Sequence, residues 1–165
     1  MEARKLSKPQ PLPFELSLRI RHPSMDPADL SRELALEAKH SFRAGDPRAL
    51  QGENTSAVHA ESYWLGTLDP TSWPADPWLS EKHDLEVAVR EARNAMTRDL
   101  GWALALSARR LLRAKSLFER IREDGGQVGM LIGVSPAAVQ SFSLMPDVSR
   151  LFSDLGITLE FDLER

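Results

Sequence analysis

Hydrophobic and polar residues alternate strictly near both ends of the chain. The apolar positions are Phe14, Leu16, Leu18 and Ile20 in the first segment and Ile157, Leu159, Phe161 and Leu163 in the last. A period of two places successive side chains on opposite faces of a strand. Both segments are therefore predicted to be strands with one buried face and one solvated face.

Extended structure is also predicted in the middle of the chain. Residues 128–134 alternate apolar residues with glycines, which indicates a strand whose second face carries little side chain. Residues 61–68 alternate in the same way and place Trp64 on the face opposite to its neighbours. A short extended segment is predicted at 40–43, just before a Gly-Asp-Pro turn.

Apolar residues recur with helical spacing between these strands. The pattern predicts helices at 27–36, 85–96, 104–121 and 148–155. Asp26 and Pro27 are a typical helix start, with a side-chain cap followed by proline in the first turn. Glycines after the last two helices provide the left-handed residue on which many helices end.

The first and last thirds of the chain thus share one pattern of strand, capped helix and strand. This predicts an α+β fold in which helices cover an antiparallel-rich sheet of about five strands, with a ferredoxin-like pseudo-repeat and a helical insertion. Residues 14–165 are predicted to form a single domain after a flexible N-terminal arm at 1–13. Residues 69–98, rich in proline and tryptophan at their start, are predicted to be the inserted loop and helix.

Charge suggests how the two terminal strands are arranged. Arg19 and Arg21 lie on the polar face of the first strand, and Glu160 and Asp162 lie on that of the last. Opposite charges on neighbouring strands stabilise their pairing. The first and final strands are therefore predicted to be adjacent.

Composition excludes several classes of function. The chain has 165 residues, 21 Lys and Arg against 24 Asp and Glu, a net charge of -3 and no cysteine. Disulfides, thiolate catalysis and cysteine-bound zinc are excluded, and the net charge disfavours nucleic acid as a partner. No apolar run is long enough to span a bilayer or to form a signal peptide, so a soluble cytoplasmic protein is expected, with no membrane partner.

Several short runs resemble a known bacterial family. They are Leu18-Arg-Ile-Arg21, the run from Asp26 to Ala38, Phe42-Arg-Ala-Gly-Asp46, Ser62-Tyr-Trp64 and the closing run from Leu155 to Leu163. Together they resemble the family catalogued as domain of unknown function 4279, from about Phe14 to the end of the chain, with 69–98 as an insertion. The resemblance implies a bacterial protein with this fold. It implies no activity, because none is established for the family.

Candidate catalytic residues are few, and no cofactor or metal site is predicted. His59 and Glu61 would share one face of an extended segment, as an acid–base pair requires. Glu160 and Asp162 are a second candidate pair of carboxylates. A solvated loop and an acidic strand face explain these residues more simply, because motifs this short often occur by chance.

Tryptophan and arginine provide the candidate binding residues. Trp73 and Trp78 lie in the proline-rich segment, which is either a lid packed on the core or an exposed docking surface. Tyr63 and Trp64 lie on opposite faces of their strand, so one of the two is expected off the main core, over a groove lined by Arg19 and Arg43. The predicted binding residues are Arg19, Arg43, Trp64, Trp73 and Trp78.

Three classes of function stay open at this point. The first is a non-catalytic binding module for another protein, of the kind found among immunity proteins. The second is a regulatory domain that binds a small molecule, for which Gly129 and Gly133 would allow close approach to the backbone. The third is a hydrolase that uses either His59 with Glu61 or Glu160 with Asp162. The partner is unidentified, and the sequence is also compatible with a homodimer.

Overall fold

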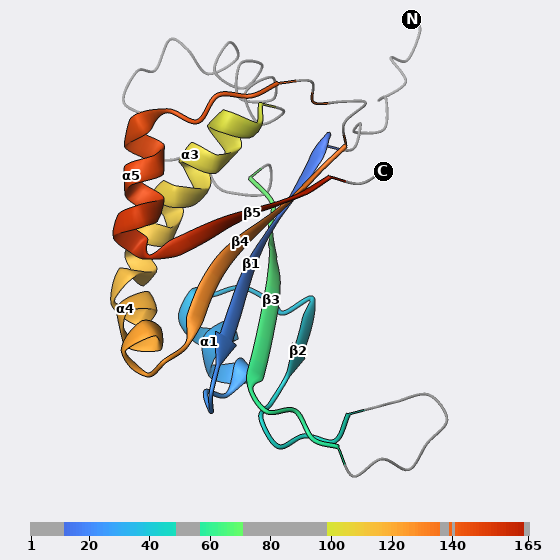
Figure 1. Cartoon of the computed structure of the whole chain (residues 1–165). Coiled ribbons are helices and arrows are strands. Elements are labelled where there is room, and N and C mark those ends of the chain that lie inside the picture. Colours follow the sequence, from blue (N-terminus) through green and yellow to red (C-terminus); the bar gives the residue numbers. More distant parts are fainter. Residues whose placement is uncertain (1–11, 49–56, 71–98, 136–138, 140, 164–165) are drawn as a thin grey trace, which may run out of the picture.

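A single twisted sheet forms one layer of the molecule (Figure 1). The computed structural model describes residues 12–48, 57–70, 99–135, 139 and 141–163. The strands are β1 (Phe14–His22), β2 (His40–Phe42), β3 (Ser62–Leu68), β4 (Gln127–Val134) and β5 (Ile157–Leu163). Their order in the sheet is β2-β3-β1-β4-β5. All neighbouring pairs are antiparallel except β4 and β5, which are parallel.

Helices form the second layer and lie on one side of the sheet (Figure 1). They are α1 (Pro27–Leu34), α3 (Leu100–Leu111), a 3-10 turn η3 (Leu112–Ala114), α4 (Lys115–Glu123) and α5 (Pro146–Leu155). The order β2-β3-β1-β4, with α1 after β1 and α3 and α4 before β4, is that of a ferredoxin-like fold. α5 and β5 add one parallel unit to its edge. The predicted α+β fold with a helix-covered, antiparallel-rich sheet is confirmed.

The predicted pairing of the first and final strands is wrong, although both strands belong to the same sheet. β4 lies between β1 and β5. The reason is that β5 follows β4 through the short crossover helix α5, and such a crossover places a strand beside its predecessor. The charges nevertheless meet, because Arg19 and Glu160 form an ion pair across β4.

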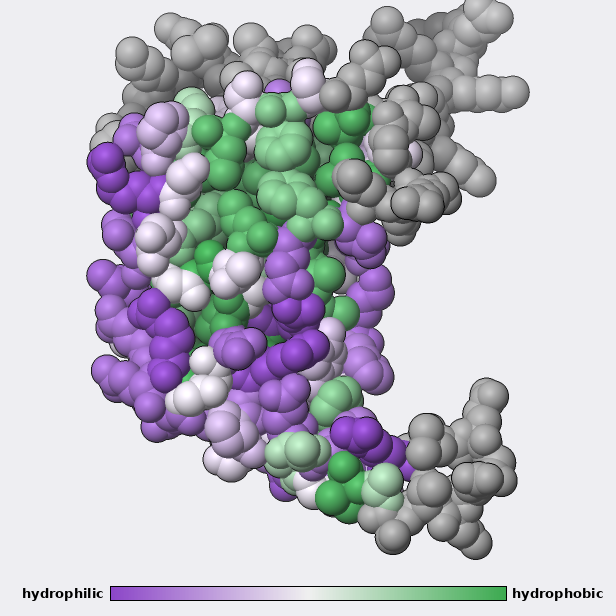
Figure 2. Space-filling model, viewed as in Figure 1, coloured by the Kyte–Doolittle hydropathy of each residue, from purple (hydrophilic) through white to green (hydrophobic). Residues whose placement is uncertain are grey.

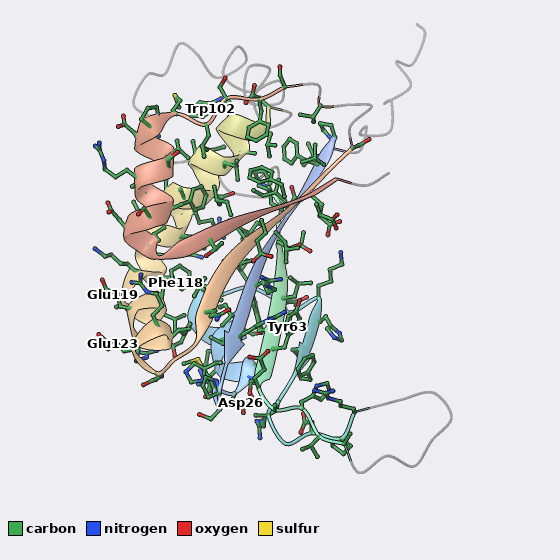
Figure 3. The ribbon with its side chains drawn as sticks, viewed as in Figure 1. Asp26, Tyr63, Trp102, Phe118, Glu119 and Glu123 are labelled. Atoms are coloured by element: carbon green, nitrogen blue, oxygen red, sulfur yellow. The ribbon has the colours of Figure 1, made fainter. Side chains whose placement is uncertain are left out.

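The core lies between the sheet and the helices. Trp64 is 0% exposed, and its Nε1 donates a hydrogen bond of 2.9 Å to the Ser31 hydroxyl on α1. Phe118 points from α4 toward the sheet and is fully buried (Figure 3). The other large buried side chains come from β1, α1, β3, α3, α4, β4 and α5: Leu16, Leu18, Ile20, Leu30, Leu68, Leu104, Ile121, Met130, Ile132 and Phe152.

Side-chain caps start two of the helices, and the first of these caps, Asp26, agrees with the prediction. The Asp26 carboxylate accepts a hydrogen bond of 2.9 Å from the Ala28 N–H, and Asp99 accepts one of 3.0 Å from the Trp102 N–H. The long helix predicted at 104–121 differs from the structure, because η3 separates α3 from α4. Beside this break, Arg113 donates a hydrogen bond of 3.2 Å to the Leu34 carbonyl at the end of α1. The interruption therefore coincides with a tertiary contact.

Helix α1 ends on a residue in an unfavourable conformation. Ala35 has φ 52° and ψ 45°, the left-handed region that costs an L-residue with a Cβ about 1–2 kcal/mol. Ala35→Gly is expected to stabilise the protein by about 0.5–1 kcal/mol, because glycine adopts this conformation without strain. Urea unfolding measures the change. An unchanged or lower midpoint would show that the strain is offset elsewhere, for example by the flexibility that glycine adds to the unfolded chain.

Apolar side chains stay exposed toward the end of β5. Ile157 is 6% exposed, whereas Phe161 is 44% exposed and stacks on Phe142 with ring centroids 5.3 Å apart. Met145 is also exposed. Figure 2 shows the apolar surface of this view gathered in its upper half, where α3, α5 and β5 lie, and polar surface over α4 below it. The predicted apolar face of the last strand is therefore only partly covered.

Some predictions fall on residues that the structure does not describe. These are most of the N-terminal arm at 1–13, most of the insertion at 69–98, and both Trp73 and Trp78. Among the described residues, no helix is long and apolar enough to cross a membrane.

Candidate functional site

The face of the sheet away from the helices carries the candidate site. Strand alternation places Arg19 and Arg21 of β1 on this face, because Leu18 and Ile20 between them are buried in the core. Gly129 of β4 is the register partner of Arg19, and Thr158 of β5 is the partner of Gly129. The three strands thus place Arg19, Gly129 and Thr158 in one row across the sheet.

A hollow of about 160 Å³ opens at this row. Its lining includes three arginines, Arg19, Arg21 and Arg122, and three glycines, Gly126, Gly129 and Gly156, together with Gln127, Val128, Thr158 and Glu160. We call it the arginine hollow. Because the glycines carry no side chain, the space above the backbone stays open between the guanidinium groups.

One arginine of the hollow is already paired. Arg19 forms an ion pair with Glu160, and the pair passes over Gly129. A Cβ at Gly129 would lie 3.1 Å from the Glu160 carboxylate and 3.6 Å from the Arg19 guanidinium. Glycine at this position is therefore what allows charges on β1 and β5 to meet across the strand between them.

The other two arginines of the hollow are less tightly paired with carboxylates. Arg21 has a loose contact with Glu61, with 3.8 Å between Nε and the carboxylate oxygen. Arg122 extends from the last turn of α4 over Gly156, where a Cβ would overlap its guanidinium. No acidic side chain in the described ranges pairs with Arg122. Its position at the C-terminal end of α5 is also favourable for a cation.

This arrangement can bind an anion. A guanidinium presents a planar fork of N–H donors that matches a carboxylate or a phosphate. The lining contains a single carboxylate, Glu160, against the three arginines. The hollow therefore has a net positive charge in a protein whose net charge is -3.

A second hollow of about 390 Å³ lies on the β2 side of the same region. It is lined by Pro23, Phe42, Arg48, His59, Ala60, Glu61 and Gly125. Phe42 stacks on His59, with ring centroids 3.7 Å apart and 19° between the planes. Phe42 also stacks on Tyr63, which lies beside β2 in Figure 3, with centroids 5.1 Å apart and 13° between the planes. We call this second space the aromatic hollow.

The predicted binding residues are only partly brought together. Arg19 lines the arginine hollow. Trp64, predicted to lie over a groove, is instead buried in the core, because the helices cover its face of β3 and Tyr63 takes the uncovered face. Arg43 pairs with Asp26 at the start of α1 and does not line either hollow. Neither hollow therefore brings Arg19 and Arg43 together.

The two candidate catalytic pairs have other contacts. His59 and Glu61 both line the aromatic hollow, but His59 stacks on Phe42 and Glu61 faces Arg21, and no hydrogen bond is found between the two. Glu160 is paired with Arg19. In the described part of the chain, no group of three or more His, Asp and Glu side chains is placed to hold a metal ion.

The arginines of the long helical segment mainly hold helices together. Arg120 donates to both carboxylate oxygens of Glu33, at 2.9 and 2.7 Å, and Arg113 reaches the Leu34 carbonyl. Burial lowers the pKa of Arg110, and the charge of Arg113 lowers it further. Arg122 differs from these residues because it extends into a hollow.

Sequence reasoning missed Arg122 and Gly156. In the sequence, Arg122 belongs to a cluster of arginines interleaved with acidic residues, for which a solvated helix face is the simpler interpretation and phosphate binding the alternative. Gly156 is expected only as a helix end. Gly129 was predicted as a point of close backbone approach, which agrees with its place in the hollow. The contact of Arg122 with Gly156 depends on how α4 and α5 pack, which local spacing does not specify.

Comparison with models of protein families, with curated proteins and with solved structures finds no match to this chain. Function is therefore argued from the two hollows, because a fold alone does not determine an activity.

Proposed function

We propose that the protein is a non-catalytic binding domain whose arginine hollow receives a small anionic ligand. The observation that carries this proposal is Arg122, a guanidinium in a hollow with no acidic partner among the described residues. Arg19 and Arg21 surround the same space and add to its positive charge. A carboxylate or phosphate in this position would complete the hydrogen bonds that Arg122 leaves open.

The remaining expectations from the sequence stay proposals beside this one. A protein partner, including one of the immunity type, would place an acidic side chain where we expect the small anion. A hydrolase is less well supported, because Glu61 and Glu160 are engaged with arginines and His59 with an aromatic ring. Cytoplasmic location, membership of the family of unknown function 4279, and a homodimer also remain proposals.

Inorganic phosphate is the simplest probe of the arginine hollow. A ligand that binds only the native state stabilises it by RT ln(1 + [L]/Kd), about 2.7 kcal/mol at about 100 times Kd. We expect phosphate to raise the Tm of the wild-type protein in a saturable way, beyond sodium chloride of equal ionic strength. Arg122→Ala should lose at least most of this shift, because it removes the unpaired guanidinium.

Arg150→Ala is the matched control. Arg150 lies on α5 with a side chain 74% exposed, and it contacts only Asp147, at 3.9 Å, among the ion pairs described. This variant should keep the full phosphate shift. An equal shift in Arg122→Ala would contradict the proposal. A host protein retained by the wild type and not by Arg122→Ala, without any phosphate effect, would instead favour the protein partner.

A further inference from the structure

The arginine hollow and the aromatic hollow adjoin. Gly126 lines the first and Gly125, its neighbour in the chain, lines the second. Arg21 of the first hollow faces Glu61 of the second, at 3.8 Å. A ligand that crosses this boundary would therefore contact cationic side chains at one end and ring systems at the other.

The register of the sheet sets how close the cationic and the aromatic side chains lie to one another. Arg21 on β1 is the partner of Tyr63 on β3, and Tyr63 is the partner of Phe42 on β2. Adjacent strands are about 4.8 Å apart, so an arginine and two aromatic rings lie within about two strand spacings. Guanidinium and stacked rings in one row are the combination that binds an anionic group attached to a flat ring.

From this juxtaposition we propose that the ligand is a nucleoside monophosphate, with its phosphate in the arginine hollow and its base in the aromatic hollow. The inference rests on the proposed anion site and extends it. Phe42 and His59 form a stacked pair that lines the wider space, and a base would extend this stack. Arg48 and Glu61 line the same space and supply a donor and an acceptor for the edge of the base.

Charge favours a free nucleotide over a nucleic acid. A strand of nucleic acid requires a broad positive surface to replace its counterions. Here the net charge is -3, and carboxylates flank the hollows at Glu61, Asp124 and Glu160. One phosphate next to one base matches the local positive charge at Arg122 better than a chain of phosphates does.

Isothermal titration with 5′-AMP, adenosine and inorganic phosphate tests the inference. We expect 5′-AMP to bind about tenfold more tightly than phosphate, since stacking of a base on aromatic side chains has about this effect or more. Adenosine should bind more weakly than 5′-AMP. Phe42→Ala should lower the affinity for 5′-AMP to that for phosphate and leave phosphate binding unchanged.

Two further variants keep the test decisive. His59→Ala removes the second ring of the stack from a loop, so it reports on the base even if Phe42→Ala weakens β2. Phe142→Ala is the matched control, because Phe142 is also a stacked phenylalanine but lies against Phe161 outside both hollows. It should leave 5′-AMP binding unchanged.

The outcomes separate this inference from the proposed function. Phosphate that binds as tightly as 5′-AMP would overturn the nucleotide and leave the anion site intact. Loss of all binding in the wild type would overturn both. Tight 5′-AMP binding that survives Phe42→Ala and His59→Ala would place the base elsewhere and overturn the inference. A hexadeoxyadenylate strand that binds more tightly than 5′-AMP would overturn the assignment to a free nucleotide.

Discussion

Trp64→Ala is expected to lower the free energy of unfolding by about 3–5 kcal/mol, the range for truncating a large aromatic side chain in a core. Trp64 is 0% exposed and lies between the sheet and α1. Its removal leaves a cavity and also takes away the hydrogen-bond partner of Ser31. Because domains are stable by only about 5–15 kcal/mol, the variant is expected to be close to unfolding. Urea unfolding followed by circular dichroism measures the loss.

Two variants separate the cavity from other effects. Trp102→Ala removes the same side chain from α3, where it is only half-buried, and should cost much less. Ser31→Ala leaves the Trp64 N–H without its acceptor and is expected to cost about 1–3 kcal/mol. A cost for Trp64→Ala as small as that for Trp102→Ala would show that α1 packs loosely on the sheet. Trp64 would then again be a candidate binding residue.

Most of the fold could be predicted from the sequence because it depends on local periodicity. The alternation in β1 and β4, the Asp26 cap of α1 and the left-handed Gly156 after α5 are local signals, and the structure confirms each of them. The side of β3 that faces the core is different. Alternation divides its residues into two faces, but only the position of the helices decides that Trp64 is buried and Tyr63 is not.

The order of the strands and the break between α3 and α4 could not be predicted, because no local pattern in the sequence specifies them. Opposite charges on β1 and β5 predicted neighbouring strands, which is wrong, although Arg19 and Glu160 do form an ion pair. The usual inference from charge to pairing fails here because Gly129 has no side chain to separate them. Residues 112–114 contain neither glycine nor proline, so nothing local indicates the interruption between α3 and α4.

The candidate site depends on long-range packing and could be predicted only in part. Arg122 reaches the hollow because α4 ends beside Gly156, and these residues are far apart in the sequence. Gly129, in contrast, stands out in the sequence as a glycine within a strong strand. A glycine in a strand usually weakens it, so its presence there indicates that something must approach the backbone closely.

Gly129→Val is the second large effect that we expect, and it should abolish phosphate binding. Its Cβ would lie 3.1 Å from the Glu160 carboxylate and 3.6 Å from the Arg19 guanidinium, and the two methyl groups would fill the space between the arginines. We expect the affinity to fall by about tenfold or more, which is about 1.4 kcal/mol or more. Valine favours strands, so the loss of binding should not come with unfolding. Titration calorimetry and the Tm measure the two quantities.

Gly133→Val is the control that shows whether the loss of binding depends on where in β4 the valine is placed. Gly133 lies on the same strand and the same face, but a Cβ there would have its nearest neighbour, on Glu15, at 3.9 Å, and it does not line the arginine hollow. This variant should bind phosphate like the wild type. If both substitutions abolish binding, the cause is a change in the twist of β4. If neither does, the anion binds outside the arginine hollow, and the space that Gly129 leaves open serves only the ion pair between Arg19 and Glu160.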